Sequence, residues 1–169
     1  MLNPIHLEKV IRNRQVSGVF PVEIHEGVAW WIGACFVVVS KTSRMVVAYD
    51  GREATEEFRR RFLKGAMNAQ HWACRIDDLG VADESQLKRT MKEQGGIPGA
   101  LLCTEQASNE LTVTIRLYDA SGELLDEDTS LACIRDMIAC DQVPIPVNEA
   151  ARGRVEDRSD LVAKTEARS

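Results

Sequence analysis

Residues 111 to 117 place the firmest constraint on how this chain folds. Apolar side chains occupy every second position, Leu111, Val113, Ile115 and Leu117, and polar side chains fill the positions between them. A repeat of two is the period of a β-strand that buries one face and turns the other toward solvent. Such a strand needs neighbouring strands and an apolar layer against its buried face. The chain therefore has to build a sheet.

Helical and extended patterns alternate along the rest of the chain. Apolar residues that recur at three- and four-residue steps predict helices, and short apolar runs that end in turn residues predict strands. This alternation predicts an α/β fold, a three-layer α/β/α arrangement on a mixed sheet, in which the last two strands form an antiparallel hairpin. The expected helices cover residues 25–40, 55–68, 84–93 and 131–138, the expected strands cover residues 44–49, 74–77, 99–104 and 111–117, and a turn is expected at residues 79–80.

Length and charge limit the organisation and the partners of the chain. Its 169 residues suit one domain, expected over residues 1–145, and a charged tail over residues 146–169 that is either disordered or a solvated helix. The net charge of -5 comes without a stripe of lysine and arginine, which argues against a nucleic-acid partner. The longest apolar stretch, residues 28–39, is too short to span a bilayer, and no secretory signal is visible. A cytoplasmic protein without a membrane partner is expected.

The cysteines predict neither disulfides nor a metal site. The five of them, Cys35, Cys74, Cys103, Cys133 and Cys140, lie among apolar neighbours, and no two have the Cys-x-x-Cys spacing. Thiols in such surroundings are expected to be buried and free in a reducing compartment. The three histidines stand far from any cysteine pair, so a zinc site is not expected.

Four stretches of the sequence resemble the first domain of the phosphoglucomutase/phosphomannomutase family, the α-D-phosphohexomutases. They lie in the family's order and close to its spacing, and together they span about residues 15–140. The family's D-x-R-G loop and the helix after it are similar to residues 17–20 and 29–36, and its V-V-x-G-x-D-x-R strand and turn are similar to residues 46–52. The strand that enters the family's phosphoserine loop is similar to residues 99–104, and its I-K-L-x-x-x-x-G strand and turn are similar to residues 115–122. The resemblance implies domain I of an intramolecular phosphotransferase of carbohydrate metabolism.

The catalytic positions depart from the pattern of that family. Its phosphoserine loop reads T-A-S-H-N-P, and without gaps these positions become Thr104, Glu105, Gln106, Ala107, Ser108 and Asn109. Gln106 then stands at the position of the serine that carries the phosphoryl group, and Ala107 at that of the histidine. An amide cannot accept and return a phosphoryl group, because this step needs an oxygen nucleophile and a nearby base. The resemblance therefore implies a degenerate loop, in which Ser108 is a nucleophile only if the loop slips by two residues.

Few ligand-binding positions of the family persist. The early arginine of the D-x-R-G loop becomes Ser17, which cannot form a bidentate contact with a phosphate. Asp50 and Arg52 persist, and the resemblance implies that they support the loop. Together with Ser108, these residues are the candidates for ligand binding. The nearest thing to a magnesium loop, residues 126–128, is more typical of a helix start, so no metal and no cofactor are expected.

Two functions follow, from different classes. The first is a non-catalytic module that binds a protein partner or a second copy of itself, favoured by Gln106, Ala107 and the adjacent Trp30 and Trp31, of which one is expected to be exposed as an interface anchor. The second is a role in carbohydrate metabolism, as a binder of hexose phosphates or as one part of a split phosphotransferase. A loop over residues 104–110 that keeps free backbone N–H groups around an anion site would favour the second.

Overall fold

A mixed sheet with helices on both faces organises the chain. The structure is a computed structural model, and it describes residues 6–69, 73–144 and 152–167. Within these residues the strand order is β1-β2-β6-β5-β3-β4-β7. The strands are β1 (Ile11–Arg12), β2 (Gln15–Phe20), β3 (Arg44–Tyr49), β4 (Arg75–Val81), β5 (Gly99–Ala107), β6 (Glu110–Tyr118) and β7 (Arg154–Asp157). The helices are α1 (Leu7–Val10), α2 (Glu26–Ser40), α3 (Glu53–Met67), α4 (Glu84–Glu93), α5 (Ser130–Ala139) and α6 (Ser159–Ala167).

The sheet has a parallel half and an antiparallel half, as the mixed-sheet prediction requires. Strands β5, β3, β4 and β7 pair in parallel with one another, whereas β1, β2, β6 and β5 pair antiparallel. The hairpin expected within residues 99–117 is the β5–β6 pair. In β6 the alternation of apolar residues works as predicted, because Val113, Ile115 and Leu117 are buried. The three-layer α/β/α prediction is confirmed.

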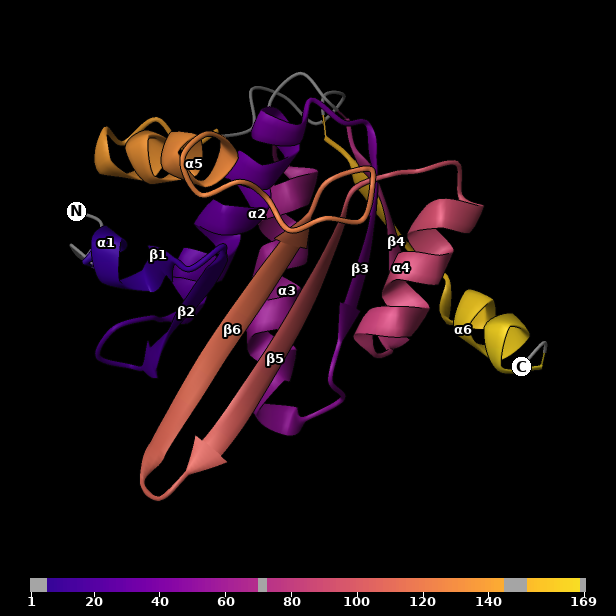
Figure 1. Cartoon of the computed structure of the whole chain (residues 1–169), viewed down its shortest axis with the longest axis horizontal. Helices are drawn as coiled ribbons and strands as arrows, with labels where there is room; N and C mark the ends of the chain where they lie inside the picture. Colours follow the sequence, from indigo (N-terminus) through magenta and orange to yellow (C-terminus); the bar gives the residue numbers. More distant parts are fainter. Residues whose placement is uncertain (1–5, 70–72, 145–151, 168–169) are drawn as a thin grey trace.

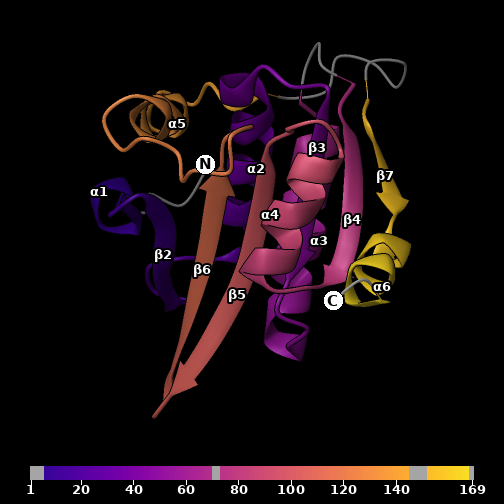
Figure 2. The same ribbon diagram turned by 45° about the vertical axis from the view of Figure 1, so that its right-hand side comes forward.

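Two apolar cores lie on opposite faces of the sheet. On β3, Met45 and Val47 belong to the larger core, with α2, α3 and α5, while Val46 and Ala48 belong to the smaller core, with α4 and α6. Figures 1 and 2 show α2 and α3 on one face and α4 on the other. A strand buried on both faces has to be apolar throughout, which explains the unbroken apolar run in β3.

Helices α2 and α3 approach each other unusually closely, because each has a glycine at the contact. A Cβ atom added to Gly33 would lie 2.2 Å from the carbonyl oxygen of Phe62, and one added to Gly65 would lie 1.9 Å from that of Trp30. Trp31 is buried, and Trp30 is half-buried and packs against the larger core. Neither tryptophan is fully exposed, so the expected exposure is wrong, while a role of Trp30 at an interface stays a prediction.

The C-terminal segment differs from the charged tail expected over residues 146–169. Strand β7 pairs in parallel with β4, and α6 places Leu161 and Val162 in the smaller core. The charged residues of β7 are consistent with this edge position, because Glu156 pairs with Arg75 of β4, Nη2 to Oε2 3.0 Å. Residues 145–151, which include the expected domain boundary, and residues 168–169 lie outside the described residues.

Two further expectations need correction. The turn expected at residues 79–80 is a bulge inside β4, where the register against β3 shifts and Gly80 has φ 70°. Of the five thiols, Cys35 and Cys74 are buried, and burial raises the pKa of each to about 12. Cys103 is half-buried, but Cys133 and Cys140 are exposed, because they lie on the side of α5 and at its end that turn away from the core. No helix in the described part of the chain has the length and apolar character needed to cross a membrane.

Candidate functional site

A β-hairpin occupies the positions that the family resemblance assigns to the phosphoserine loop. Strand β5 continues to Ala107 and β6 begins at Glu110, with Ala107 opposite Glu110 and Thr104 opposite Val113. Only Ser108, with φ 54°, and Asn109 remain for the turn. Figures 1 and 2 show this hairpin projecting beyond the other strands of the sheet. The loop expected over residues 104–110 is therefore wrong, because residues 104–107 and residue 110 belong to paired strands and leave a turn of two residues.

The candidate residues of the hairpin are spread along it and enclose no site. The side chains of residues 105–110 are exposed, and none of them lines either cavity described below. The Gln106 side chain donates from Nε2 to the carbonyl oxygens of Ser108, at 3.4 Å, and Glu110, at 3.2 Å. The Gln106 side chain therefore stabilises the turn of the hairpin. The Ser108 hydroxyl lies at the exposed tip of that turn.

Asp50 and Arg52 hold the strand that leads into the hairpin. Strand β3 ends at Tyr49, and beyond it Asp50 Oδ2 accepts from Thr104 N at 2.8 Å while Arg52 Nη1 donates to Thr104 O at 2.9 Å. Asp50 Oδ1 also accepts from Arg52 N at 3.0 Å. The buried Thr104 hydroxyl contacts the Thr55 hydroxyl of α3 at 2.8 Å. These contacts fix the start of α3 to β5. The backbone pairing of β3 with β5 ends at Tyr49 and Leu102, and beyond that point the side chains of Asp50 and Arg52 bond to the backbone of β5 instead.

A cavity of about 490 Å³ lies beside Asp50, at the carboxyl ends of β3 and β4. Ligands of open α/β sheets bind at such an edge. Four charged side chains line the cavity, the carboxylates of Asp50, Asp83 and Glu84 and the guanidinium of Arg116, so the lining carries more negative than positive charge. Its other lining residues are Val81, Ala82, Gln86, Leu101 and Cys103.

The carboxylates of this edge cavity are held by partners within the protein. Asp83 caps α4 by accepting from Gln86 N at 2.8 Å, and Gln86 Oε1 accepts in return from Asp83 N at 2.9 Å. Glu84 Oε1 accepts from Tyr118 OH at 3.0 Å and pairs with Lys88 Nζ at 3.2 Å. The hydrogen bond from Lys88, with that from Tyr118, lowers the pKa of Glu84. Burial, with the bond to Glu84, raises the pKa of Tyr118.

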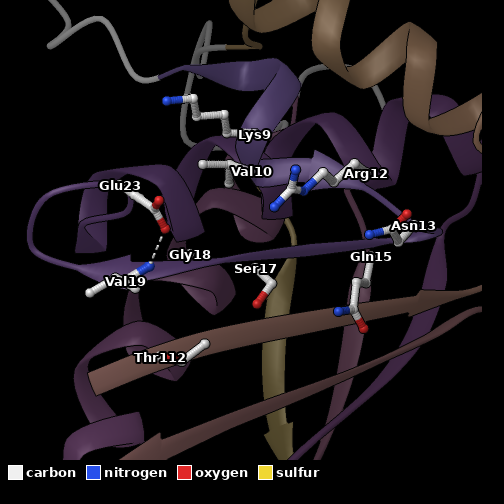
Figure 3. Close-up of a pocket in the computed structure, with 10 residues that line it drawn as sticks. All are labelled: Lys9, Val10, Arg12, Asn13, Gln15, Ser17, Gly18, Val19, Glu23 and Thr112. Carbon is white, nitrogen blue, oxygen red and sulfur yellow. Dashed lines mark hydrogen bonds between the residues drawn. The ribbon is translucent and has the colours of Figure 1, made fainter. Parts of the chain in front are cut away.

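A second, smaller cavity lies around Ser17. Ser17 belongs to strand β2 and not to a loop as the resemblance implied, because β2 pairs with β6 along almost all of its length. Its hydroxyl contacts the Thr114 hydroxyl at 3.1 Å. The cavity of about 180 Å³ is lined by Lys9, Val10, Arg12, Asn13, Gln15, Ser17, Gly18, Val19, Glu23 and Thr112. Figure 3 shows Arg12 extending from β1 back along β2 toward Ser17 and Gly18.

The charges around the Ser17 cavity differ from those at the carboxyl edge. Lys9 and Arg12 are exposed, and neither has an ion pair with a carboxylate of the described residues. Glu23 is the acidic residue of the lining, and its Oε2 accepts from Val19 N at 2.8 Å. Two strands, β6 and β5, separate β2 from β3, so the structure brings Asp50, Arg52 and Thr104 together but leaves Ser17 and Ser108 apart from them.

Sequence reasoning missed Asp83, Glu84 and Arg116. Residues 83–86 have the sequence of a capping box before a helical pattern, which is a local signal for the start of α4. Arg116 lies in the alternating strand, at a polar position opposite Leu101. Their meeting at one cavity depends on strand pairing between distant segments, for which the sequence contains no local signal.

Comparisons with known proteins identify the fold. No family model matches the sequence, and no curated protein matches it either. Among solved structures, the chain is similar to a phosphoglucomutase/phosphomannomutase family protein from Burkholderia thailandensis, with a TM-score of 0.72 and 16% identity over 95% of this chain and 35% of that one. A putative phosphomannomutase from Thermus thermophilus gives a TM-score of 0.64 and 16% identity over 93% of this chain and 34% of that one. The fold is that of a phosphohexomutase domain.

The phosphohexomutase fold confirms the resemblance drawn from four short stretches. The chain spans about a third of the length of each of the two structures. At 16% identity the likeness concerns the arrangement of helices and strands. What this domain does therefore has to be inferred from its own residues, and above all from the hairpin and the two cavities.

Proposed function

We propose that this chain is a non-catalytic binding module built on a phosphohexomutase domain. The observation that carries the proposal is the hairpin of β5 and β6, in which Gln106 and Ala107 are strand residues at the positions of the family's nucleophile and histidine. A paired strand cannot fold around a phosphoryl group in the way that a loop can. The exposed Ser108 hydroxyl lines neither cavity.

The charge at the carboxyl edge supports the same proposal. Phosphoryl transfer needs cations around the reacting phosphate, since the transition state spreads negative charge over its oxygens. The edge cavity instead places three carboxylates and one guanidinium around the space where a ligand of this fold would lie. Carboxylates at a few ångströms repel a phosphate dianion, and the repulsion is stronger at a partly desolvated site than in bulk water.

The proposal predicts that the purified chain transfers no phosphoryl group. With glucose 1-phosphate or mannose 1-phosphate, Mg²⁺ and a trace of glucose 1,6-bisphosphate, we expect turnover no greater than that of a blank without protein. We also expect no stable label on the protein after incubation with ³²P-labelled bisphosphate, whereas an active phosphoglucomutase labels in parallel. Stoichiometric label that disappears in Ser108→Ala would contradict the proposal and make the tip serine a nucleophile.

A second candidate, a hexose-phosphate binder in carbohydrate metabolism, is favoured by the Ser17 cavity. Arg12 and Lys9 supply two cations beside hydroxyl and amide groups from Ser17, Gln15 and Thr112. A phosphate prefers such donors, because hydrogen bonds between charged groups are the strong ones. The neutral donors around the same space suit sugar hydroxyls.

This second candidate predicts saturable binding that depends on Arg12. In calorimetric titration with hexose 1-phosphates and hexose 6-phosphates, Arg12→Gln is expected to weaken binding about tenfold, the effect of losing one charge-assisted hydrogen bond. Arg89→Gln is the matched control, because Arg89 is exposed on α4 and does not line the Ser17 cavity. Flat traces with every sugar phosphate would exclude this candidate and leave the non-catalytic module unchanged.

A further inference from the structure

The edge cavity combines an apolar floor with an exposed apolar side chain at its margin. Val81 is 58% exposed. In the described part of the chain, Val22 is the one other large apolar residue that is exposed. Ala82 and Leu101 below Val81 are buried and Cys103 is half-buried, and all three line the cavity. Val81 lies against Gly51, where an added Cβ would be 3.0 Å from its methyl groups. An apolar side chain of a partner can therefore be buried here without displacing the core.

Carboxylates from three segments of the chain lie at or next to the cavity. Asp50 follows β3, and Asp83 and Glu84 begin α4. Glu105 does not line the cavity but lies just outside it, because it is two residues beyond Cys103 on the same face of β5, and its charge acts on the Cys103 thiol. Three cations, Arg116, Arg52 and Lys88, lie among these four carboxylates, so the rim keeps one net negative charge.

The rim carboxylates are fixed in place before any ligand binds. Asp50 accepts from the backbone of Thr104 and Arg52, Asp83 caps α4, and Glu84 is bonded to Tyr118 and Lys88. A preformed ring of this kind costs little conformational entropy when a partner binds.

We infer that this cavity is the docking site for a protein segment that presents one apolar side chain flanked by lysine or arginine. The apolar side chain would cover Val81 and Leu101, and the flanking cations would lie against Glu105 on one side and Asp83 on the other. The cavity volume of about 490 Å³ falls within the range of sites that enclose a side chain or small ligand. This inference rests on the proposed function as a binding module, and it names the class of partner.

Titration of the ¹⁵N-labelled full chain with a model peptide tests this inference. The probe is acetyl-GKRLRKG-amide, and the comparison peptides are GKRGRKG, which lacks the anchor, and GEELEEG, which reverses the charges. We expect saturable amide shifts at Val81, Ala82 and Leu101 with the first peptide. We expect binding at least about fivefold weaker with the second, no saturation with the third, and weaker binding as NaCl rises from about 50 to about 300 mM.

Two substitutions with matched controls separate the apolar floor from the acidic rim. Val81→Ser is expected to weaken binding of the leucine peptide about fivefold, and Glu105→Lys about threefold, since each removes one of the two contacts. The controls are Val22→Ser, which removes the other exposed valine, and Glu93→Lys, which changes an exposed carboxylate at the far end of α4. Both control variants are expected to bind within about twofold of the unmodified chain.

Three results would overturn the inference. The first is an absence of shifts at the edge cavity with the leucine peptide. The second is equal binding of the charge-reversed peptide. The third is concentration-dependent broadening of the same amides without peptide, which would assign the surface to a second copy of the chain. None of these results bears on phosphoryl transfer, which the labelling experiment above measures separately, so failure of the inference and failure of the proposed function are distinguishable.

Discussion

Replacing Gly65 by alanine is expected to lower the free energy of unfolding by at least about 2 kcal/mol. The new Cβ would lie 1.9 Å from the carbonyl oxygen of Trp30, and a backbone atom cannot move aside as a side chain can. Helices α2 and α3 would have to separate, which opens the larger core along its length. Overpacking of this kind costs about 1–3 kcal/mol or more, and the better helix propensity of alanine returns about 1 kcal/mol.

Urea unfolding followed by circular dichroism measures this effect as a lower midpoint with an unchanged slope. Gly80→Ala is the matched control, because Gly80 has φ 70° but no atom within 4 Å of an added Cβ. There the cost is backbone strain alone, about 1–2 kcal/mol. A Gly65→Ala variant as stable as the unmodified chain would show that the two helices can separate without loss, and would contradict the steric explanation.

Replacing Asp77 by asparagine is expected to cost about 3 kcal/mol. Asp77 is completely buried in β4, and its carboxylate pairs with Arg44, Nη2 to Oδ2 3.4 Å, and with Arg75, Nε to Oδ1 3.1 Å. Breaking a buried ion pair costs about 3–5 kcal/mol, because the remaining charge is left without its partner. The lower end of that range applies here, since both arginines reach solvent.

Thermal and urea unfolding of the Asp77→Asn variant test this expectation, with Glu57→Gln as the control. Glu57 pairs with Arg60 and Arg61 on the surface of α3, and exposed pairs of this kind contribute about 0–1 kcal/mol. Arg75 also pairs with Glu156, so hydrogen exchange in β7 should accelerate in the Asp77 variant and stay constant in the control. Equal stability of the two variants would mean that the buried carboxylate contributes nothing net.

Local signals explain which elements the sequence predicts well. Helix α4 has the predicted bounds because Asp83 caps its start, and Gly95 and Gly96 follow its end with φ 97° and φ 78°. Strand β6 is predictable because one of its faces is buried and the other is not, which produces the repeat of two. In both cases the pattern comes from residues close together in the sequence: the capping residue and glycines at the ends of α4, and the buried and exposed faces of β6.

The elements that could not be predicted from the sequence have no such local pattern. Residues 105–107 are exposed on both faces of the hairpin, so no apolar repeat distinguishes a strand there from the loop that the family resemblance suggests. Strand β7 has one apolar residue, Val155, and its pairing with β4 joins segments about 80 residues apart. The edge cavity has the same origin, because Asp50, Glu84 and Arg116 meet only through the order of the strands.

The pairing of β2 with β6 also determines the order in which this protein is completed on the ribosome. The two strands are separated by about 90 residues, from Phe20 to Glu110. At about 5–20 residues per second, a ribosome needs roughly 5–18 s to synthesise that interval. During this time β2 emerges before β6, the strand that pairs with it, exists. A strand made early, β2, is therefore among the last to be incorporated, and the nascent chain exposes to chaperones a strand edge that the finished domain pairs.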